Sequence, residues 1–170
     1  MITMKKNQFN LIPSGITTIR IILAFIFLFL FLNGQLQLSV AIFIIAIFTD
    51  ALDGYMARKL NSTSSTGAYL DIAADFILVL IAFIVFAVKG IYPYWVLFLI
   101  FMVFFQFILT SKLKILVYDP VGKYYGSFLF GIILITIITP FNQFLLLIIV
   151  LFTLLSLLSR YLFLIFKNRK

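Results

Sequence analysis

Four aspartates lie close together in a sequence that holds almost no other acid. The chain has 170 residues and five acidic side chains, and one short stretch contains Asp50, Asp53, Asp71 and Asp75. Residues three or four apart share one face of a helix, so each pair would share a face. Carboxylates held together repel one another unless cations join them, and their oxygens favour hard ions such as Mg²⁺, Mn²⁺ or Ca²⁺. Because two such ions can promote displacement at phosphorus, the spacing indicates phosphoryl chemistry.

The residue types that are missing narrow the chemistry further. The sequence contains no His, no Cys and no Glu. Their absence excludes disulfides, redox thiols and the usual zinc sites, and it removes the commonest general base. Acid–base and metal chemistry must therefore rest mainly on the aspartates.

The composition predicts an all-α integral membrane protein. Hydrophobic residues make up 65% of the chain and charged residues 11%, and the mean hydropathy is +1.25. A helix needs about 20 apolar residues to span a bilayer, so six spans would use most of the chain. We expect one membrane domain over residues 1–170 and an interfacial segment at 1–13. The expected transmembrane helices are 14–32, 38–58, 67–88, 92–110, 121–139 and 141–166.

The basic residues orient these six helices. The net charge is +8, which in a soluble protein would suggest a nucleic-acid partner. In a membrane protein, the positive-inside rule and the anionic lipid surface explain it better, and we expect no nucleic acid. With the N-terminus in the cytosol, the expected spans place all 13 Lys and Arg on the cytosolic side except Lys89. We therefore expect both termini and the aspartate site to face the cytosol at the cytoplasmic membrane.

Small residues and one arginine accompany the aspartates. Gly54 and Ala57 fall on the helical face of the first aspartate pair, and Gly67 lies one turn before the second. Such positions leave room for a ligand against the backbone, and Arg58 adds a planar donor suited to phosphate. The alternative is a helix-packing face of small residues with solvated acids at the membrane surface, although packing needs no acids.

The motif D-x2-D-G-x2-A-R-x8-G-x3-D-x3-D covers residues 50–75 with every spacing intact and resembles the signature of the CDP-alcohol phosphatidyltransferase family. The resemblance implies a membrane enzyme of phospholipid biosynthesis. Such an enzyme transfers a phosphatidyl or archaetidyl group from a CDP-linked lipid to a small polar alcohol and releases CMP. Family members are commonly homodimers, and we expect a homodimer by analogy.

The resemblance also implies a role for each residue of the motif. Two divalent cations, Mg²⁺ or Mn²⁺, would be held by Asp50, Asp53, Asp71 and Asp75. The last of these aspartates would also be the catalytic base. The CDP-binding site would consist of Asp50, Gly54, Ala57, Arg58 and Gly67.

The N-terminal sequence bears on the identity of the acceptor alcohol. I-P-S-G-I-T-T-I-R at 12–20 resembles the P-N-x-L-T-x-x-R opening of phosphatidylglycerophosphate synthases, with Ser14 in place of the usual Asn. Phe76 also replaces the Lys that commonly follows the last aspartate. This resemblance implies glycerol 3-phosphate as the acceptor, with inositol phosphate, inositol or serine as alternatives. A phosphorylated acceptor needs cations, which we expect among Arg20, Lys123 and Arg160.

Two alternatives remain open at this point. Arg20 lies inside an expected span, where a charged side chain usually has a function, but it could instead extend to the membrane surface. A function of another class, divalent-cation transport, would also use carboxylates within the membrane. Transport predicts acids along a path across the bilayer, whereas the four motif aspartates cluster at one side of it.

Overall fold

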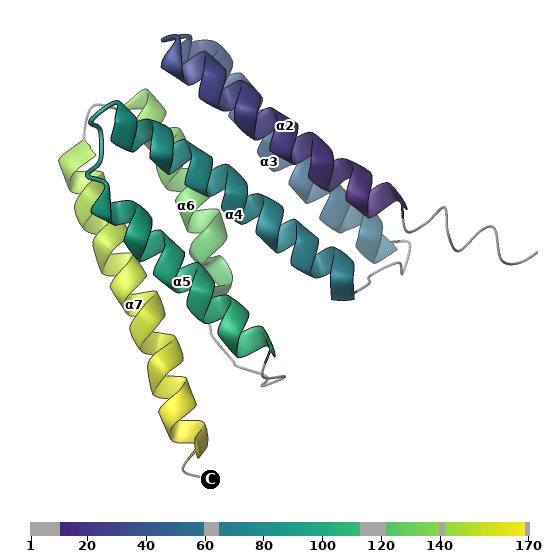
Figure 1. Cartoon of the computed structure of the whole chain (residues 1–170), viewed down its shortest axis with the longest axis vertical. Coiled ribbons are helices and arrows are strands. Elements are labelled where there is room, and N and C mark those ends of the chain that lie inside the picture. The colour runs from purple at the N-terminus through teal and green to yellow at the C-terminus, as the bar shows by residue number, and fades with distance from the viewer. Residues whose placement is uncertain (1–10, 60–64, 113–121, 140–141, 169–170) are drawn as a thin grey trace, which may run out of the picture. The chain divides into compact units, whose positions relative to one another are not determined.

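The computed structural model describes residues 11–59, 65–112, 122–139 and 142–168, and the side chains within 19–49, 52, 72–109, 124–139 and 142–162. This part of the chain forms six α-helices and no β-strand. The helices are α2 (Leu11–Leu32), α3 (Leu36–Lys59), α4 (Ser65–Val88), α5 (Trp95–Lys112), α6 (Gly122–Ile138) and α7 (Asn142–Asn168) (Figure 1). The predicted all-α fold with six helices is therefore confirmed.

The start of the first helix differs from the prediction. α2 begins at Leu11, so the last residues of the predicted interfacial segment belong to the helix, and residues 1–10 lie outside the described part. Pro13 falls in the first turn of α2, where a backbone N–H has no partner within the helix and proline is tolerated. The other five helices begin and end within three residues of the predicted bounds.

Two glycines mark tight turns between helices. Gly34 follows α2 with a φ of 74°, and Gly90 follows α4 with a φ of 72°. Residues with a side chain rarely adopt this left-handed conformation, so glycine is the favoured residue at both helix ends. Asn33 also caps its helix, because its side-chain amide donates a hydrogen bond to the carbonyl of Phe29 at 2.8 Å. The turn predicted at Asn33–Gly34 is confirmed.

The chain forms two compact units, Met1–Val85 and Phe86–Lys170. In the first unit α2 packs along α3, and Figure 1 shows α3 and α4 running in opposite directions. The ring of Phe27 lies at the centre of this packing. Its centroid is 5.4 Å from that of Phe43 on α3 and 5.8 Å from that of Phe31, one turn further along α2.

In the second unit α5 and α6 both pack against α7. The rings of Phe128 and Phe152 stack with centroids 4.1 Å apart and join α6 to α7. Beside this stack, the hydroxyl groups of Tyr125, three residues before Phe128, and Thr153, directly after Phe152, form a buried hydrogen bond of 2.9 Å between the same helices. Aromatic stacking and a satisfied polar contact therefore hold this pair of helices together.

The helices present large apolar side chains on their outer faces. Exposed aromatic residues include Phe29 on α2, Phe48 on α3, Phe98 on α5 and Phe144 on α7. In a soluble protein, apolar surface of this kind would mark a binding or membrane interface. Within the described residues, Asn142–Leu162 of α7 is long and apolar enough to cross a membrane, and the apolar stretches of the other helices are shorter.

The packing in the first unit predicts a large difference between two phenylalanines of α2. Phe27 is fully buried, whereas Phe29 is 67% exposed. We expect Phe27→Ala to lower the free energy of unfolding by about 3–5 kcal/mol, because it leaves a cavity between α2 and α3. Phe29→Ala should change it by no more than about 0.5 kcal/mol. Denaturation in mixed detergent micelles, followed by circular dichroism, measures both, and equal losses would contradict this packing.

Candidate active site

The buried face of α2 includes an arginine. Ala24, Phe27 and Phe31 are buried, and they follow Arg20 at intervals of four, seven and eleven residues, which keeps all four on one face of the helix. The Arg20 side chain is 0% exposed. It therefore lies inside the protein. The alternative that Arg20 extends to the membrane surface does not describe the structure.

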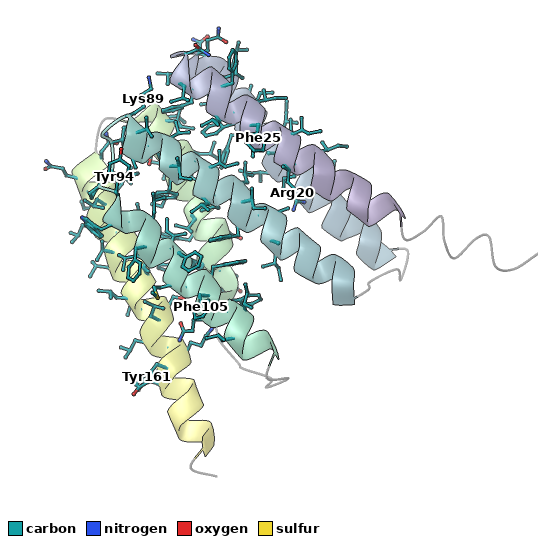
Figure 2. The ribbon with its side chains drawn as sticks, viewed as in Figure 1. Arg20, Phe25, Lys89, Tyr94, Phe105 and Tyr161 are labelled. Carbon is teal, nitrogen blue, oxygen red and sulfur yellow. The ribbon has the colours of Figure 1, made fainter. Side chains whose placement is uncertain are left out.

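Arg20 forms an ion pair with the last aspartate of the motif. Its Nη1 donates a hydrogen bond to Oδ1 of Asp75 at 2.8 Å and so joins α2 to α4 within the first unit. Figure 2 labels Arg20 on α2. The two residues lie at similar distances along their helices. Arg20 is nine residues after the first residue of α2, and Asp75 is ten after the first residue of α4. Asp75 is the more open partner, with 31% of its side chain exposed. A hydrogen bond between two charged groups is stronger than one between neutral groups.

The first aspartate pair continues the buried face of α3. Ser39, Phe43 and Ala46 are buried at intervals of four and three residues. Asp50 and Asp53 extend the same spacing towards the end of the helix. The hydroxyl of Thr49, the residue before Asp50, donates hydrogen bonds to the carbonyls of Ile45 and Ala46 in the same helix. The backbone of α3 thus places the first two acids in line with its core-facing residues.

The second aspartate pair occupies the equivalent position on α4. Leu78, Ala82 and Val85 are buried, and they follow Asp75 at intervals of three, seven and ten residues. Asp71 lies one turn before Asp75 on the same line. The motif acids of both helices therefore lie at the ends of two rows of residues that are buried and, apart from Ser39 on α3, apolar.

The two helices place these acids at matching distances from the α3–α4 connection. Asp53 is six residues before the last residue of α3, and Asp71 is six after the first residue of α4, which is about 9 Å along each axis. Asp50 and Asp75 are nine and ten residues from the same ends, which is about 14–15 Å. Antiparallel helices with this spacing carry the four acids at two levels.

Several predicted site residues lie outside the described side chains, although their backbones belong to helices. These are Asp50, Asp53, Gly54, Ala57, Arg58, Gly67, Asp71 and Lys123. Arg160, on α7, is described and belongs to the second unit. It is buried, and its guanidinium carbon lies 5.3 Å from the ring centroid of Phe107 on α5, within the range of a cation–π contact. Its role in acceptor binding stays a prediction.

Sequence reasoning selected Arg20 and Asp75 separately and did not predict that they touch. The two residues are 55 positions apart, so no local spacing in the sequence connects them. One signal could have found the pair. Both are charges of opposite sign within apolar helices, where ionisable side chains usually pair with one another.

The donor set of the motif fits a divalent cation. Four carboxylates at two levels offer only oxygen ligands, which suits Mg²⁺ or Mn²⁺, and Arg20 supplies only one positive charge against them. Among the side chains that the structure describes, no three acids, histidines or cysteines form a metal-binding group. Three of the four motif aspartates are not among those side chains.

The ion pair predicts an energetic coupling between α2 and α4. We expect Asp75→Leu alone to be strongly destabilising, because it leaves the buried Arg20 without its carboxylate. Adding Arg20→Met should recover part of the loss, with a coupling energy of about 1–3 kcal/mol in a double-mutant cycle of detergent unfolding. Arg20→Met combined with Phe29→Ala is the control and should be additive. Additive losses for the Arg20 and Asp75 variants would contradict the contact.

Comparison with known proteins places this arrangement in a family. The family model of CDP-alcohol phosphatidyltransferase matches residues 10–163. Proteins named CDP-diacylglycerol–glycerol-3-phosphate 3-phosphatidyltransferase are similar. The one from Wigglesworthia glossinidia brevipalpis is 38% identical over 76 residues, 45% of this chain and 41% of its own length. The one from Salmonella choleraesuis is 37% identical over 92 residues, 52% of this chain and 50% of its own length.

A third relative of the same name, from Bacillus subtilis, is 46% identical over 54 residues, 32% of this chain and 28% of its own length. The chain therefore spans about half the length, or less, of these curated relatives. The family match is much longer and includes the whole aspartate motif together with Arg20. This chain belongs to the CDP-alcohol phosphatidyltransferase family.

Proposed function

We propose that the protein transfers a phosphatidyl or archaetidyl group from a CDP-linked lipid to glycerol 3-phosphate and releases CMP. The observation that carries this proposal is the family match over residues 10–163, which contains the complete motif from Asp50 to Asp75. The three relatives described above are named for this reaction with CDP-diacylglycerol and glycerol 3-phosphate. The protein would therefore act in phospholipid biosynthesis.

Asp75 is the best-placed base for the reaction. Its side chain is partly open, so a substrate hydroxyl can reach it, and the sequence has no histidine to take this role. In the proposed step, the acceptor hydroxyl gives its proton to the Asp75 carboxylate. The oxygen of the acceptor then bonds to the phosphorus next to the lipid, and the bond from that phosphorus to the CMP oxygen breaks.

The other motif residues would hold the donor. We assign two divalent cations, Mg²⁺ or Mn²⁺, to Asp50, Asp53, Asp71 and Asp75. When bound, these ions would polarise the phosphoryl group and offset the charge of the leaving group. The nucleotide would lie against the small residues Gly54, Ala57 and Gly67, and Arg58 would contact its phosphates.

Arg20 would bind a phosphate group on the acceptor. A buried guanidinium favours an anion, and Arg20 already contacts the proposed base. An acceptor whose phosphate reaches Arg20 would therefore bring its hydroxyl close to Asp75. Lys123 and Arg160, which belong to the second unit, stay predictions from the sequence as further cations for acceptor binding.

We place the protein in the cytoplasmic membrane with six spans and with both termini and the site facing the cytosol. The exposed apolar faces of the helices and the distribution of Lys and Arg support this placement. The lipid donor could then reach the site from within the bilayer, and the alcohol could reach it from water. A homodimer is proposed by analogy with the family.

A test of the reaction is CMP release from CDP-diacylglycerol by purified protein with Mg²⁺ or Mn²⁺. Glycerol 3-phosphate should support release most strongly among glycerol 3-phosphate, inositol phosphate, inositol and serine, because only a phosphorylated acceptor of the right size engages Arg20. EDTA should abolish release. If no acceptor in this panel supports CMP release, the proposed function is wrong.

The base is tested by Asp75→Asn, which keeps the size of the side chain. We expect transfer to fall by about 10²–10⁴-fold, since the amide cannot take the hydroxyl proton. Binding of the CDP-lipid, measured separately, should largely persist. Phe29→Ala, on the exposed face of α2, is the control and should leave the transfer rate unchanged. A variant that still transfers at the normal rate would remove Asp75 from this role.

A further inference from the structure

The connection between α4 and α5, residues 89–94, has an ordered backbone that closes the end of α4. The N–H of Gly90 donates a hydrogen bond to the carbonyl of Ala87 at 3.0 Å. The N–H of Ile91 donates to the carbonyl of Phe86 at 2.8 Å. These two bonds, together with the left-handed conformation of Gly90, form the Schellman motif that ends many helices. The chain therefore leaves α4 in a defined direction.

Tyr92 joins this connection to α6. Its side chain is buried, and its hydroxyl lies 2.6 Å from the hydroxyl of Thr136. Because the Thr136 hydroxyl donates its proton to the carbonyl of Ile132 at 2.7 Å, Tyr92 is the donor in the bond between the two hydroxyls. The ring of Tyr92 also meets the ring of Phe86 edge-on, with centroids 5.8 Å apart. The residues on either side of Tyr92 are thereby held in place within the second unit.

The exposed side chains around Tyr92 are of the kinds that gather at membrane surfaces. Tyr94 is 66% exposed, Trp95 is 50% exposed, and Lys89 is exposed as well. Figure 2 labels Lys89 and Tyr94 at this connection. Tyrosine and tryptophan combine an apolar ring with a polar group, so they are enriched where hydrocarbon meets headgroups. A lysine can place its methylene groups against apolar surface and its ammonium group among lipid phosphates.

The apolar face of α5 indicates the depth of these side chains. Phe101 and Phe105 follow Phe98 at intervals of three and seven residues, which keeps all three on one face of the helix. Each of the three is about half exposed, and the rings of Phe101 and Phe105 stack with centroids 6.2 Å apart. A hydrocarbon environment suits this face. Trp95, the first residue of α5, therefore lies where the apolar face ends.

We propose that Lys89, Tyr94 and Trp95 form a binding surface for the headgroup region of phospholipids. The two aromatic rings lie at the level of the glycerol esters, and Lys89 contacts the lipid phosphates. The hydrogen bond of Tyr92 with Thr136 holds this surface at its depth. The inference rests on the proposed placement in the membrane, and it adds which residues of the outer side contact lipid headgroups.

The alternative is a protein partner that covers the same aromatic side chains. The order of residues along α5 favours lipid, because the apolar face runs on from the first turn while the polar groups lie at one end of it. This order matches the change from headgroups to hydrocarbon across a bilayer surface.

Trp95 gives a direct test, because it is the only tryptophan in the chain. The purified full chain is reconstituted into phosphatidylcholine vesicles whose acyl chains carry bromine either near the glycerol end or near the methyl end. Quenching of tryptophan fluorescence by each lipid, and by iodide in the buffer, then measures the depth of Trp95. We expect the shallow bromines to quench about twofold more strongly than the deep ones.

Three results would overturn the proposal. Equal quenching at the two depths, or stronger quenching by the deep bromines, would place Trp95 in the hydrocarbon core. Quenching by iodide but by neither lipid would place it in water. Quenching by none of the three would indicate that a protein partner covers it. Flotation of the chain with the vesicles tests the membrane placement separately, because a chain that does not float contradicts the placement and, with it, this inference.

The role of Tyr92 is tested by Tyr92→Phe, which keeps the ring and removes the hydrogen bond to Thr136. We expect the mobile fraction in the fluorescence anisotropy decay of Trp95 to rise about twofold and the preference for shallow bromines to fall. Tyr125→Phe is the matched control, because it removes the same kind of hydrogen bond, from Tyr125 to Thr153, near the first residue of α6. It should leave both readouts of Trp95 unchanged. Equal changes in the two variants, or no change in Tyr92→Phe, would overturn this role.

Discussion

The ion pair between Arg20 and Asp75 is the interaction on which the site depends. It is the described charged contact that joins α2 to the motif helix α4, and one of its members is fully buried. Charges in such surroundings are stable only when they are paired and hydrogen-bonded, so each residue constrains the position of the other. Through this contact the N-terminal helix is joined to the helix that carries Asp71 and Asp75.

The apolar packing determines where the acids lie. Core residues repeat at intervals of three and four along α3 and α4, and the motif aspartates continue the same lines towards the connection between the helices. Helix register therefore places the motif aspartates on the same lines as the buried residues Phe43 and Leu78. In physical terms, each of these mostly apolar helix faces ends in two aspartates.

The sequence predicted the helices better than it predicted their contacts. Long apolar runs and the turn at Gly34 located the elements, because length and hydrophobicity are local properties. The motif spacing likewise located the acids on shared helix faces, which the helical backbone now supports. The contact of Arg20 with Asp75 was missed because it depends on how α2 rotates against α4 across 55 residues. The hydrogen bond of Tyr125 with Thr153 was missed for the same reason, because it depends on how α6 and α7 pack.

The central claim is that a buried arginine on α2 recognises the phosphate of the acceptor beside the base on α4. The most direct measurement is the ratio of kcat/KM for glycerol 3-phosphate to kcat/KM for glycerol, in the wild type and in Arg20→Gln. The account predicts a strong preference for the phosphorylated acceptor in the wild type and a fall in this preference of about a hundredfold in the variant, because a desolvated charged partner is lost. An unchanged preference in a folded Arg20→Gln protein would contradict it.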